Sequence, residues 1–342
     1  MVAPTIPLID FSAFHSDDTE TKQSLVAQIG AACRHSGFFQ IINHGISESL
    51  QQELLSCSEE LFSLPIDIKE KYNKDIDGFN RGYERLRSQN FEKRTQGDLK
   101  EGYYFGLDLP LSHPKVTAGT FGLGPNKYPQ HVKNPDHFKR TIDTYHASMR
   151  KLSENLFRTL CKTLDVEDSW VPELTETPIA VLRLLHYPPQ SPHASELERG
   201  IGAHTDFGAI TILLQDQVGG LQVLDRITQT WVDVNPTPGA LVVNLGNLMM
   251  RWTNDRYISN LHRVINRSGC ERYSVPFFFS GNPDFLVKCF PQFEANGEQG
   301  RAKYPPVTVG EWISGRYADT YGTSEVKAVS ELSTAEAEIG LA

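Results

Sequence analysis

The chain has 342 residues, of which 39% are hydrophobic and 22% are charged, so it is long enough and apolar enough to fold around a sizeable core. Its formal net charge of -9, without a basic stripe in the sequence, argues against nucleic acid as a partner. Five widely spaced cysteines, no secretory leader and no apolar run of about 18 residues argue against a disulfide-built secreted protein and a membrane protein, and favour a cytoplasmic one.

The first half of the chain predicts helices interrupted by short strands. A strand is expected over residues 6–11, and a second β-rich segment follows at 38–42. Between them, residues 20–34 repeat apolar side chains at helical spacing up to Gly37, which ends that run. Ser47 can cap a further helix, because a serine at the N-cap accepts a hydrogen bond from a backbone N–H of the first turn.

Two longer segments follow in the same half. Residues 75–130 are rich in glycine, proline and polar side chains and show no clear period, so we expect loops that form a lid or a pocket wall. Residues 135–165 carry one continuous apolar stripe at helical spacing. This stripe predicts the longest helix of the protein.

In the second half, short β-type runs are separated by Gly, Pro, Asn and Asp. Many short strands with regular turns indicate a sandwich or barrel. We expect one compact unit in which region 1–177 packs on a β core at 178–285, followed by a C-terminal helix and tail at 286–342. The expected strands are 179–185, 209–215, 220–224, 231–234, 240–244, 261–265 and 273–279, and the final helix is 309–321.

The most informative local pattern is His204-Thr205-Asp206. Alternate residues of a strand point to the same face of a sheet, so this imidazole and this carboxylate are expected to project together. We choose His262 as the third ligand, because it lies in a β-type run 262 − 206 = 56 positions later, which leaves room for several strands and a return to the first. Two histidines and one carboxylate leave coordination positions open, as in iron(II) oxygenases and unlike structural zinc sites.

A second pair of residues begins ten positions after His262. Arg272 and Ser274 are again alternate residues of an expected strand, and a guanidinium fork beside a hydroxyl is suited to hold a carboxylate. A keto acid that chelates iron at one end needs such an anchor at the other. A structural salt bridge of Arg272 is the alternative interpretation.

With these residues in place, the chain resembles the isopenicillin N synthase-like family of Fe(II)/2-oxoglutarate-dependent dioxygenases. One of its motifs is similar to that of fungal-type members such as thymine dioxygenase. The resemblance implies an α+β fold with a double-stranded β-helix (jelly roll) core flanked by helices. The motifs that carry it are, in order, residues 6–11, 37–45, 80–83, 98–103, 182–188, 202–208, 219–223, 244–246, 262–264 and 272–274.

The resemblance also implies an activity and residue roles. The enzyme would use Fe(II), 2-oxoglutarate and O2, with ascorbate as a reductant, to hydroxylate a C–H bond of a small organic molecule and release succinate and CO2. Fungal-type relatives place such reactions in secondary metabolism, and no obligatory protein partner is implied. The implied site residues are His204, Asp206 and His262 as catalytic iron ligands, Arg272, Ser274 and Tyr187 for 2-oxoglutarate, and Arg183, Phe207 and Phe278 for the substrate.

Two positions depart from the family's pattern. Asn247 stands where an aspartate is common, and Leu185 stands where an asparagine is common two residues before the tyrosine. Three alternatives stay open. They are a 2-oxoglutarate-independent oxidative cyclase or desaturase of the isopenicillin N synthase type, a catalytically inactive jelly roll that binds a ligand, and a cupin-type metal hydrolase. Succinate release during turnover would separate the first from a 2-oxoglutarate enzyme.

Overall fold

The computed structural model of the protein describes residues 5–91, 97–191, 193–194, 198–295 and 301–321. The tail expected after the last helix, residues 322–342, lies outside the described residues. None of the helices in these ranges combines the length and the apolar surface that a membrane crossing requires.

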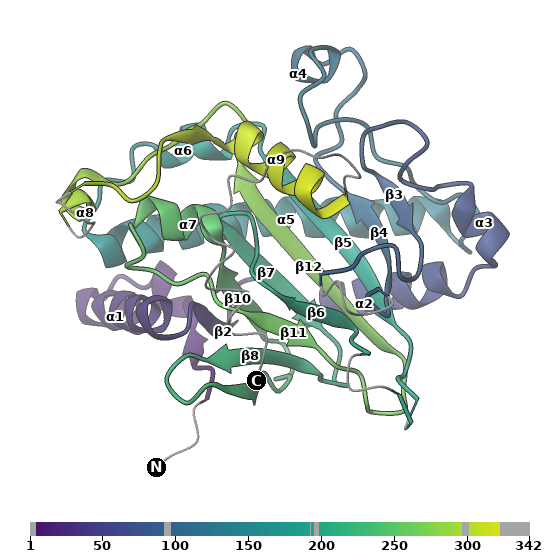
Figure 1. The fold of residues 1–342 in the computed structure, drawn as a ribbon, viewed down its shortest axis with the longest axis horizontal. Coiled ribbons are helices and arrows are strands. Elements are labelled where there is room, and N and C mark those ends of the chain that lie inside the picture. Colours follow the sequence, from purple (N-terminus) through teal and green to yellow (C-terminus); the bar gives the residue numbers. More distant parts are fainter. Residues whose placement is uncertain (1–4, 92–96, 192, 195–197, 296–300, 322–342) are drawn as a thin grey trace.

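The strands form two large sheets and a small two-stranded one (Figure 1). The larger sheet contains, in spatial order, β1 (Leu8–Asp10), β2 (Phe38–Ile42), β10 (Leu241–Leu245), β7 (Ile210–Gln215), β12 (Arg272–Gly281), β5 (Ile179–Tyr187), β4 (Glu101–Phe105) and β3 (Gly82–Glu84). The smaller sheet contains β6 (Ile201–His204), β11 (His262–Val264), β8 (Leu221–Asp225) and β9 (Thr230–Asp233), and β13 (Leu286–Val287) pairs with β14 (Val307–Thr308). Strands distant in sequence are neighbours in both large sheets, which confirms the expected α+β fold with a jelly-roll core.

The helices surround this core. They are α1 (Thr19–His35), α2 (Glu48–Phe62), α3 (Ile66–Glu70), α4 (Pro114–Thr117), α5 (Pro135–Leu164), α6 (Val171–Thr175), α7 (Asn247–Trp252), α8 (Pro291–Glu294) and α9 (Val309–Tyr321), with a 3-10 helix at Phe11–His15. Figure 1 shows α5 behind the larger sheet and α9 crossing in front of it. The helical layer therefore covers one face of the larger sheet, and the other face is left for the smaller sheet and α9.

The longest helix, α5, was predicted correctly from its apolar stripe. It begins where Asn134 accepts a hydrogen bond from the backbone N–H of His137, with Pro135 at the first helical position, and it ends at Asp165 in the left-handed conformation. The stripe is almost fully buried, as expected from its helical period. The buried apolar residues are Phe138, Ile142, Tyr145, Met149, Leu152, Leu156, Phe157, Leu160, Cys161 and Leu164.

The antiparallel pairing of β5 with β12 positions the cavity of the protein. Arg272 lies opposite Tyr187, and Phe278 lies opposite Val181, so the two strands run side by side over most of their length. Side chains alternate between the two faces of a strand. As a result, the odd-numbered residues of β5 and the even-numbered residues of β12 all line one cavity. Most of the intervening residues of the two strands, such as Phe277, are buried on the face that the helices cover, whereas His186 and Tyr273 are partly exposed.

The expectation of loops over residues 75–130 is wrong in part. The segment contains β3 and β4, and β4 pairs with β5 inside the larger sheet. All five residues of β4 are buried, so the alternation of polar and apolar residues that marks a half-exposed strand is missing. For that reason the sequence pattern did not reveal this strand.

Gly37, which follows α1, provides a test of how the helical layer is joined to the core. A Cβ at this position would lie 2.1 Å from the carbonyl oxygen of Ile258, and the backbone is left-handed (φ +70°). We expect Gly37→Ala to lower the free energy of unfolding by about 2–4 kcal/mol, through overpacking and left-handed strain. Gly45→Ala is the matched control, since Gly45 is left-handed (φ +87°) without any atom within 4 Å of the added carbon. Urea unfolding should show the smaller loss for this control, and equal losses would contradict the steric argument.

Candidate active site

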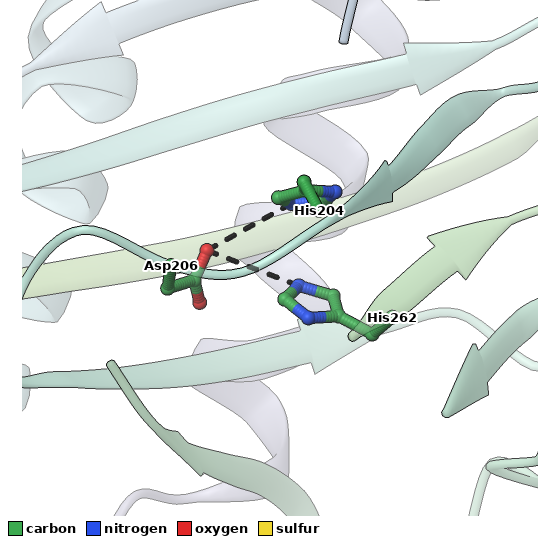
Figure 2. A group of neighbouring side chains, drawn as sticks. All are labelled: His204, Asp206 and His262. Atoms are coloured by element: carbon green, nitrogen blue, oxygen red, sulfur yellow. Dashed lines mark ion pairs between the residues drawn. The ribbon is translucent and has the colours of Figure 1, made fainter. Parts of the chain in front are cut away.

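Two imidazoles and one carboxylate converge at the edge of the smaller sheet (Figure 2). His204 is the last residue of β6, and it lies opposite His262, the first residue of β11. Oδ1 of Asp206 lies 3.8 Å from Nε2 of each histidine. The potential ligand atoms of all three residues lie within 4.8 Å of one another, and no other such cluster occurs in the described ranges. The donor set matches the two-histidine, one-carboxylate face of non-haem iron(II) sites.

Hydrogen bonds determine which atom of each histidine faces this point. Nδ1 of His204 lies 2.8 Å from the carbonyl oxygen of Gly202, and Nδ1 of His262 lies 3.2 Å from that of Asn260. A carbonyl oxygen only accepts, so each Nδ1 carries the hydrogen. Each Nε2 therefore keeps its lone pair for a metal ion.

Asp206 is oriented in a similar way by two residues of the larger sheet. Its Oδ2 accepts hydrogen bonds from Thr211 Oγ1 at 2.6 Å and from Asn244 Nδ2 at 2.7 Å. Thr211 and Asn244 lie opposite each other on β7 and β10. The other oxygen, Oδ1, is the one that faces the imidazoles (Figure 2).

The expectation that Asp206 lies in the same strand as His204 is wrong. β6 ends at His204, and Asp206 lies in the irregular segment that connects β6 to β7. The turn that begins α7 supports this segment, because the N–H of Asn247 donates to the carbonyl oxygen of Asp206 at 2.8 Å. A Cβ on Gly246 would lie only 2.9 Å from that oxygen. Asn247, which stands where an aspartate is common in the family, thus contacts Asp206 through its backbone N–H.

Burial and mutual charge set the protonation of these groups. Burial lowers the pKa of His204 to about 3, and the neighbouring His262 adds to this shift. Burial alone would raise the pKa of Asp206, but His262, His204 and the hydrogen bonds from Asn244 and Thr211 hold it below its usual value. Near neutral pH the cluster offers a neutral His204 imidazole and a charged carboxylate, which are the states that bind metal ions.

Arg272 lies in the same cavity as a buried cation without an acidic partner. The side chain is fully buried, and no carboxylate of the described residues lies within ion-pair distance. Its Nε donates to Gly219 O at 2.5 Å and its Nη2 to Gln215 Oε1 at 3.3 Å, whereas its Nη1 has no hydrogen-bond partner. A buried charge is costly unless it is paired. The site therefore fits an anion such as the distal carboxylate of a keto acid.

The three residues expected to bind a co-substrate lie together. Ser274 is two residues along β12 from Arg272, and its hydroxyl donates to the hydroxyl of Tyr187 at 3.4 Å. The ring centroid of Tyr187 lies 4.7 Å from Cζ of Arg272. These three residues are called the clamp below.

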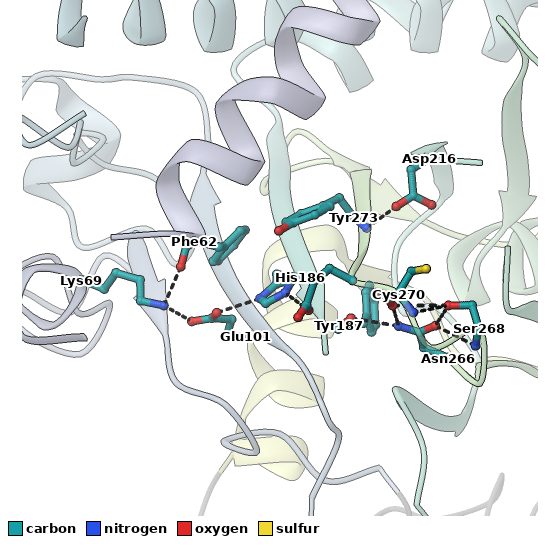
Figure 3. A network of polar contacts seen from close by, with 11 residues as sticks. Phe62, Lys69, Glu101, His186, Tyr187, Asp216, Asn266, Ser268, Cys270 and Tyr273 are labelled. Carbon is teal, nitrogen blue, oxygen red and sulfur yellow. Dashed lines mark hydrogen bonds and ion pairs between the residues drawn. The ribbon is translucent and has the colours of Figure 1, made fainter. Parts of the chain in front are cut away.

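A polar network holds the opposite face of the clamp strands (Figure 3). His186 follows Leu185 and precedes Tyr187 on β5, with Nδ1 2.8 Å from Glu101 Oε1 and Nε2 2.7 Å from Glu271 Oε2. Tyr273 stacks on the imidazole with ring centroids 4.9 Å apart. The network joins β4, β5 and β12 and so restrains the strands that carry the clamp.

The cluster and the clamp open into one cavity of about 1160 Å³, its open mouth included. The three residues expected near a substrate, Arg183, Phe207 and Phe278, all line it. Several lining residues were not predicted individually, although most of them fall in the segment 75–130 that was expected to form a pocket wall. They are Arg81, Gln89, Phe91, Lys100, Phe121 and Tyr317.

A buried carboxylate lies behind the cationic part of this wall. Oε2 of Glu84 accepts hydrogen bonds from Lys100 Nζ, at 3.1 Å, and from Tyr104 OH, and Lys74 Nζ lies 3.7 Å from Oε1. Burial opposes the charge of Glu84, but Lys100, Arg183 and Lys74 outweigh that effect and hold its pKa at about 2. Glu84 is thus a charged partner shared by several cations.

Two family profiles match this chain, one over its N-terminal region and one over its β core. The profile of the 2OG-Fe(II) oxygenase superfamily matches residues 178–281, and the profile described as "non-haem dioxygenase in morphine synthesis N-terminal" matches residues 6–131. The 2-oxoglutarate-Fe(II) type oxidoreductase hxnY of Emericella nidulans is 48% identical over 326 residues, which cover 95% of this chain and 93% of that protein. The 2-oxoglutarate-dependent dioxygenase citB of Monascus ruber is 38% identical over 321 residues, covering 92% and 95%.

A solved structure gives the same result. The fold matches that of the full-length thymine-7-hydroxylase of Neurospora crassa in complex with alpha-KG, with a TM-score of 0.81 and 27% sequence identity, covering 92% of this chain and 96% of that one. The chain therefore belongs to the 2OG-Fe(II) oxygenase superfamily, among its fungal-type members. It is a 2-oxoglutarate-dependent dioxygenase that uses Fe(II). The alternatives of a co-substrate-independent cyclase, an inactive jelly roll and a cupin-type hydrolase are set aside.

The buried ion pair behind the cavity gives a stability test. Glu84→Gln should lower the free energy of unfolding at pH 7 by about 3–5 kcal/mol, because Lys100 stays buried without its carboxylate. The folded-state pKa of Glu84 lies below the ordinary value of 4.5, so its contribution is complete above pH 4.5 and is lost as the pH falls toward 2. Urea unfolding should show the difference from wild type shrinking over that range. Exposed Glu53→Gln is the control, and a pH-independent difference for Glu84→Gln would refute the argument.

Proposed function

We propose that His204, Asp206 and His262 hold the catalytic Fe(II) of this dioxygenase. The supporting observation is that two Nε2 atoms and one Oδ1 atom face a single point, while the remaining polar atom of each side chain is already hydrogen-bonded. Such fixed orientation lowers the cost of assembling the ligands around the metal.

The clamp is proposed to bind 2-oxoglutarate. The unpaired Nη1 of buried Arg272 supports this role, since the distal carboxylate of 2-oxoglutarate would supply the anion that the described residues do not. Ser274 adds a hydroxyl beside the guanidinium, and Tyr187 covers it with its ring. Leu185 lines the cavity next to these residues, so an apolar contact stands where other members of the family have an amide.

Fe(II), 2-oxoglutarate and O2 supply the oxidising power when bound, with decarboxylation to succinate and CO2 and transfer of oxygen to a substrate C–H bond. The residues of the chain fix positions and exclude water. Phe91 stacks on His204 with ring centroids 4.4 Å apart, and Phe38 meets His262 edge-on at 5.2 Å. These rings shield the imidazoles, which keeps the reacting centre dry.

The reaction is proposed to be hydroxylation of a small organic molecule held by Arg183, Phe207 and Phe278. These residues line the cavity that also holds the proposed metal ligands. A structure of the Neurospora crassa thymine-7-hydroxylase contains alpha-KG and thymine, so a protein of similar fold binds a small ring together with the co-substrate. That precedent and the names of fungal relatives support a role in the metabolism of small molecules, including secondary metabolism.

Two further expectations are retained as proposals. All five cysteines are unpaired, which supports a reducing compartment such as the cytoplasm. The region 1–177 is proposed to pack on the β core at 178–285, with 286–342 added as the C-terminal part. The lining of the cavity by residues of α9 supports the placement of the C-terminal part.

Alanine variants test the proposed metal ligands. His204→Ala, Asp206→Ala or His262→Ala should weaken Fe(II) binding by more than about 100-fold, since loss of an outer-sphere partner alone costs roughly 10- to 100-fold. Iron content after dialysis and succinate formation should fall together. Exposed His137→Ala is the control and should keep both. A ligand variant with full iron content and full succinate formation would show that the assignment is wrong.

A conservative substitution tests the clamp. Arg272→Lys should weaken 2-oxoglutarate binding by roughly 10- to 150-fold, because a point charge cannot reproduce the guanidinium fork. Fe(II) binding should not change. Anaerobic titration of the Fe(II) enzyme with 2-oxoglutarate gives the affinity, and exposed Arg226→Lys serves as control. Equal 2-oxoglutarate affinities of Arg272→Lys and wild type would rule out the clamp.

A further inference from the structure

The clamp lies at one end of the ladder that β5 and β12 form. Tyr187 is the last residue of β5 and Arg272 is the first residue of β12, and the two lie opposite each other. Both strands end at this pair, so its backbone has ladder neighbours on one side only. The ends of a ladder open more easily than its centre. The relative position of Arg272 and Tyr187 therefore depends on side-chain contacts near this end.

His186 makes such contacts with both of its ring nitrogens (Figure 3). Its Nδ1 lies 2.8 Å from Oε1 of Glu101 on β4, and its Nε2 lies 2.7 Å from Oε2 of Glu271. Glu271 directly precedes Arg272 in the chain. The imidazole therefore links the neighbouring strand β4 to the point at which β12 and the clamp begin.

The two contacts specify the protonation of this imidazole. A carboxylate oxygen only accepts hydrogen bonds, so each ring nitrogen needs a hydrogen to bond its carboxylate. Burial alone would raise the pKa of Glu101, but hydrogen bonds from His186, Lys69 and Tyr83 hold it below its usual value, so this carboxylate is charged near neutral pH. Only the doubly protonated, positively charged imidazole satisfies both contacts. A neutral imidazole satisfies one of them and turns a lone pair toward the other carboxylate.

The two carboxylates differ in how they respond to loss of the proton. Glu101 is buried, and its other oxygen accepts hydrogen bonds from Lys69 Nζ at 2.8 Å and from Tyr83 OH at 2.6 Å. The side chain of Glu271 is 52% exposed, and His186 is its only partner among the described residues. Leaving a buried oxygen unpaired costs more free energy than returning an exposed one to water. The remaining hydrogen therefore stays on Nδ1, toward Glu101, and Glu271 is released.

Several further groups surround the imidazole. Phe62 of α2 and Tyr273 of β12 stack on it, with ring centroids 5.5 and 4.9 Å away. Burial and the charges of Glu271 and Glu59 raise the pKa of Tyr273 to about 12, so this phenol stays neutral over the pH range in which a histidine titrates. The titratable and charged groups around the ring, contributed by α2, α3, β3, β4, the end of β7 and the start of β12, are Glu59, Lys69, Tyr83, Glu101, Asp216, Glu271 and Tyr273.

We propose that His186 is a positioning residue for 2-oxoglutarate and that its positively charged form gives the higher affinity. The proposal rests on the proposed function, in which the clamp binds the distal carboxylate of 2-oxoglutarate. With the proton present, His186 holds Glu271 and so fixes Arg272 opposite Tyr187. Loss of the proton releases this end of β12, and binding must then order the guanidinium again, which costs affinity. The affinity for 2-oxoglutarate therefore falls as the pH rises.

Glu271→Gln tests the proposal at a half-exposed position. A glutamine amide accepts a hydrogen bond from a protonated Nε2 and donates one to an unprotonated Nε2, so this variant keeps its contact with His186 in both states. The Mn(II) form of each enzyme is titrated calorimetrically with 2-oxoglutarate, without O2, from about pH 6 to about pH 9. The ratio of the dissociation constants, wild type to Glu271→Gln, should rise roughly three- to tenfold over this range. The ratio cancels the titration of the proposed metal ligands, which both proteins share.

His186→Gln tests the same role by removing the ring that titrates. At about pH 6 this variant should bind 2-oxoglutarate roughly three- to tenfold more weakly than wild type, and at about pH 9 the two affinities should agree. A purely structural role would weaken binding equally at every pH, and that result would overturn the proposal. Exposed Glu53→Gln and exposed His137→Gln are the matched controls, and both should follow wild type throughout.

The outcomes separate this inference from the proposed function. A ratio of wild type to Glu271→Gln that stays constant over the pH range overturns the role of the proton on His186. Equal affinities of His186→Gln and wild type at the acidic end of the range show that His186 does not position the clamp. Wild type that binds Mn(II) but not 2-oxoglutarate would instead overturn the proposed function. Far-UV circular dichroism shows whether each variant is folded, and Glu271→Gln decides the question if His186→Gln does not fold.

Discussion

The two hydrogen bonds that Asp206 Oδ2 accepts from Thr211 and Asn244 fix the carboxylate in the segment that connects β6 of the smaller sheet to β7 of the larger one. Both donors belong to the larger sheet, whereas His204 and His262 belong to the smaller one. Without these bonds a buried carboxylate would be poorly satisfied and free to rotate about its side chain, and the point where the three ligand atoms meet would be lost. The geometry of the proposed metal site therefore depends on how the sheets of the jelly roll are held together, beyond the local sequence around the histidines.

The pleat of β5 and β12 extends this organisation along the cavity. Because alternate residues share a face, β5 presents Tyr187, Leu185, Arg183 and Val181 in order, from the clamp to the opposite end. The proposed co-substrate and substrate positions are thus separated by a fixed number of strand residues. This arrangement buries charged groups, which costs free energy. On the opposite face, the network around His186 helps to hold the strands in register.

Spacing in the sequence predicted which residues lie close together when they belong to one strand or to two paired strands. Arg272 and Ser274 share a face because they are alternate residues of β12, and His262 pairs with His204 across two strands, as their separation in sequence suggested. Asp206 was placed in a strand that ends before it, because nothing in a short motif shows where tertiary contacts stop a strand. β4 was missed because both of its faces are buried. Arg81, Phe91 and Lys100 come from the segment 75–130, which shows no clear period, and Tyr317 comes from the predicted final helix, so only the packing of the whole chain brings them to one cavity.

The segments of the chain that supply the residues lining the cavity indicate how the fold can act on different substrates. The proposed iron ligands and Arg272 lie in the segment matched by the 2OG-Fe(II) oxygenase profile, whereas Arg81, Lys100 and Phe121 precede it and Tyr317 follows it. α9, which carries Tyr317, is held close to the proposed metal site because its Trp312 Nε1 donates to the carbonyl oxygen of Phe207, the residue after Asp206, at 2.8 Å. The segments that precede and follow the matched segment are therefore held in place relative to the proposed metal site, although they contribute none of the proposed iron ligands. Substitutions in them can change the charge and shape of the substrate wall without disturbing the hydrogen bonds that orient Asp206 and the histidines, and this separation allows relatives with the same chemistry to act on different molecules.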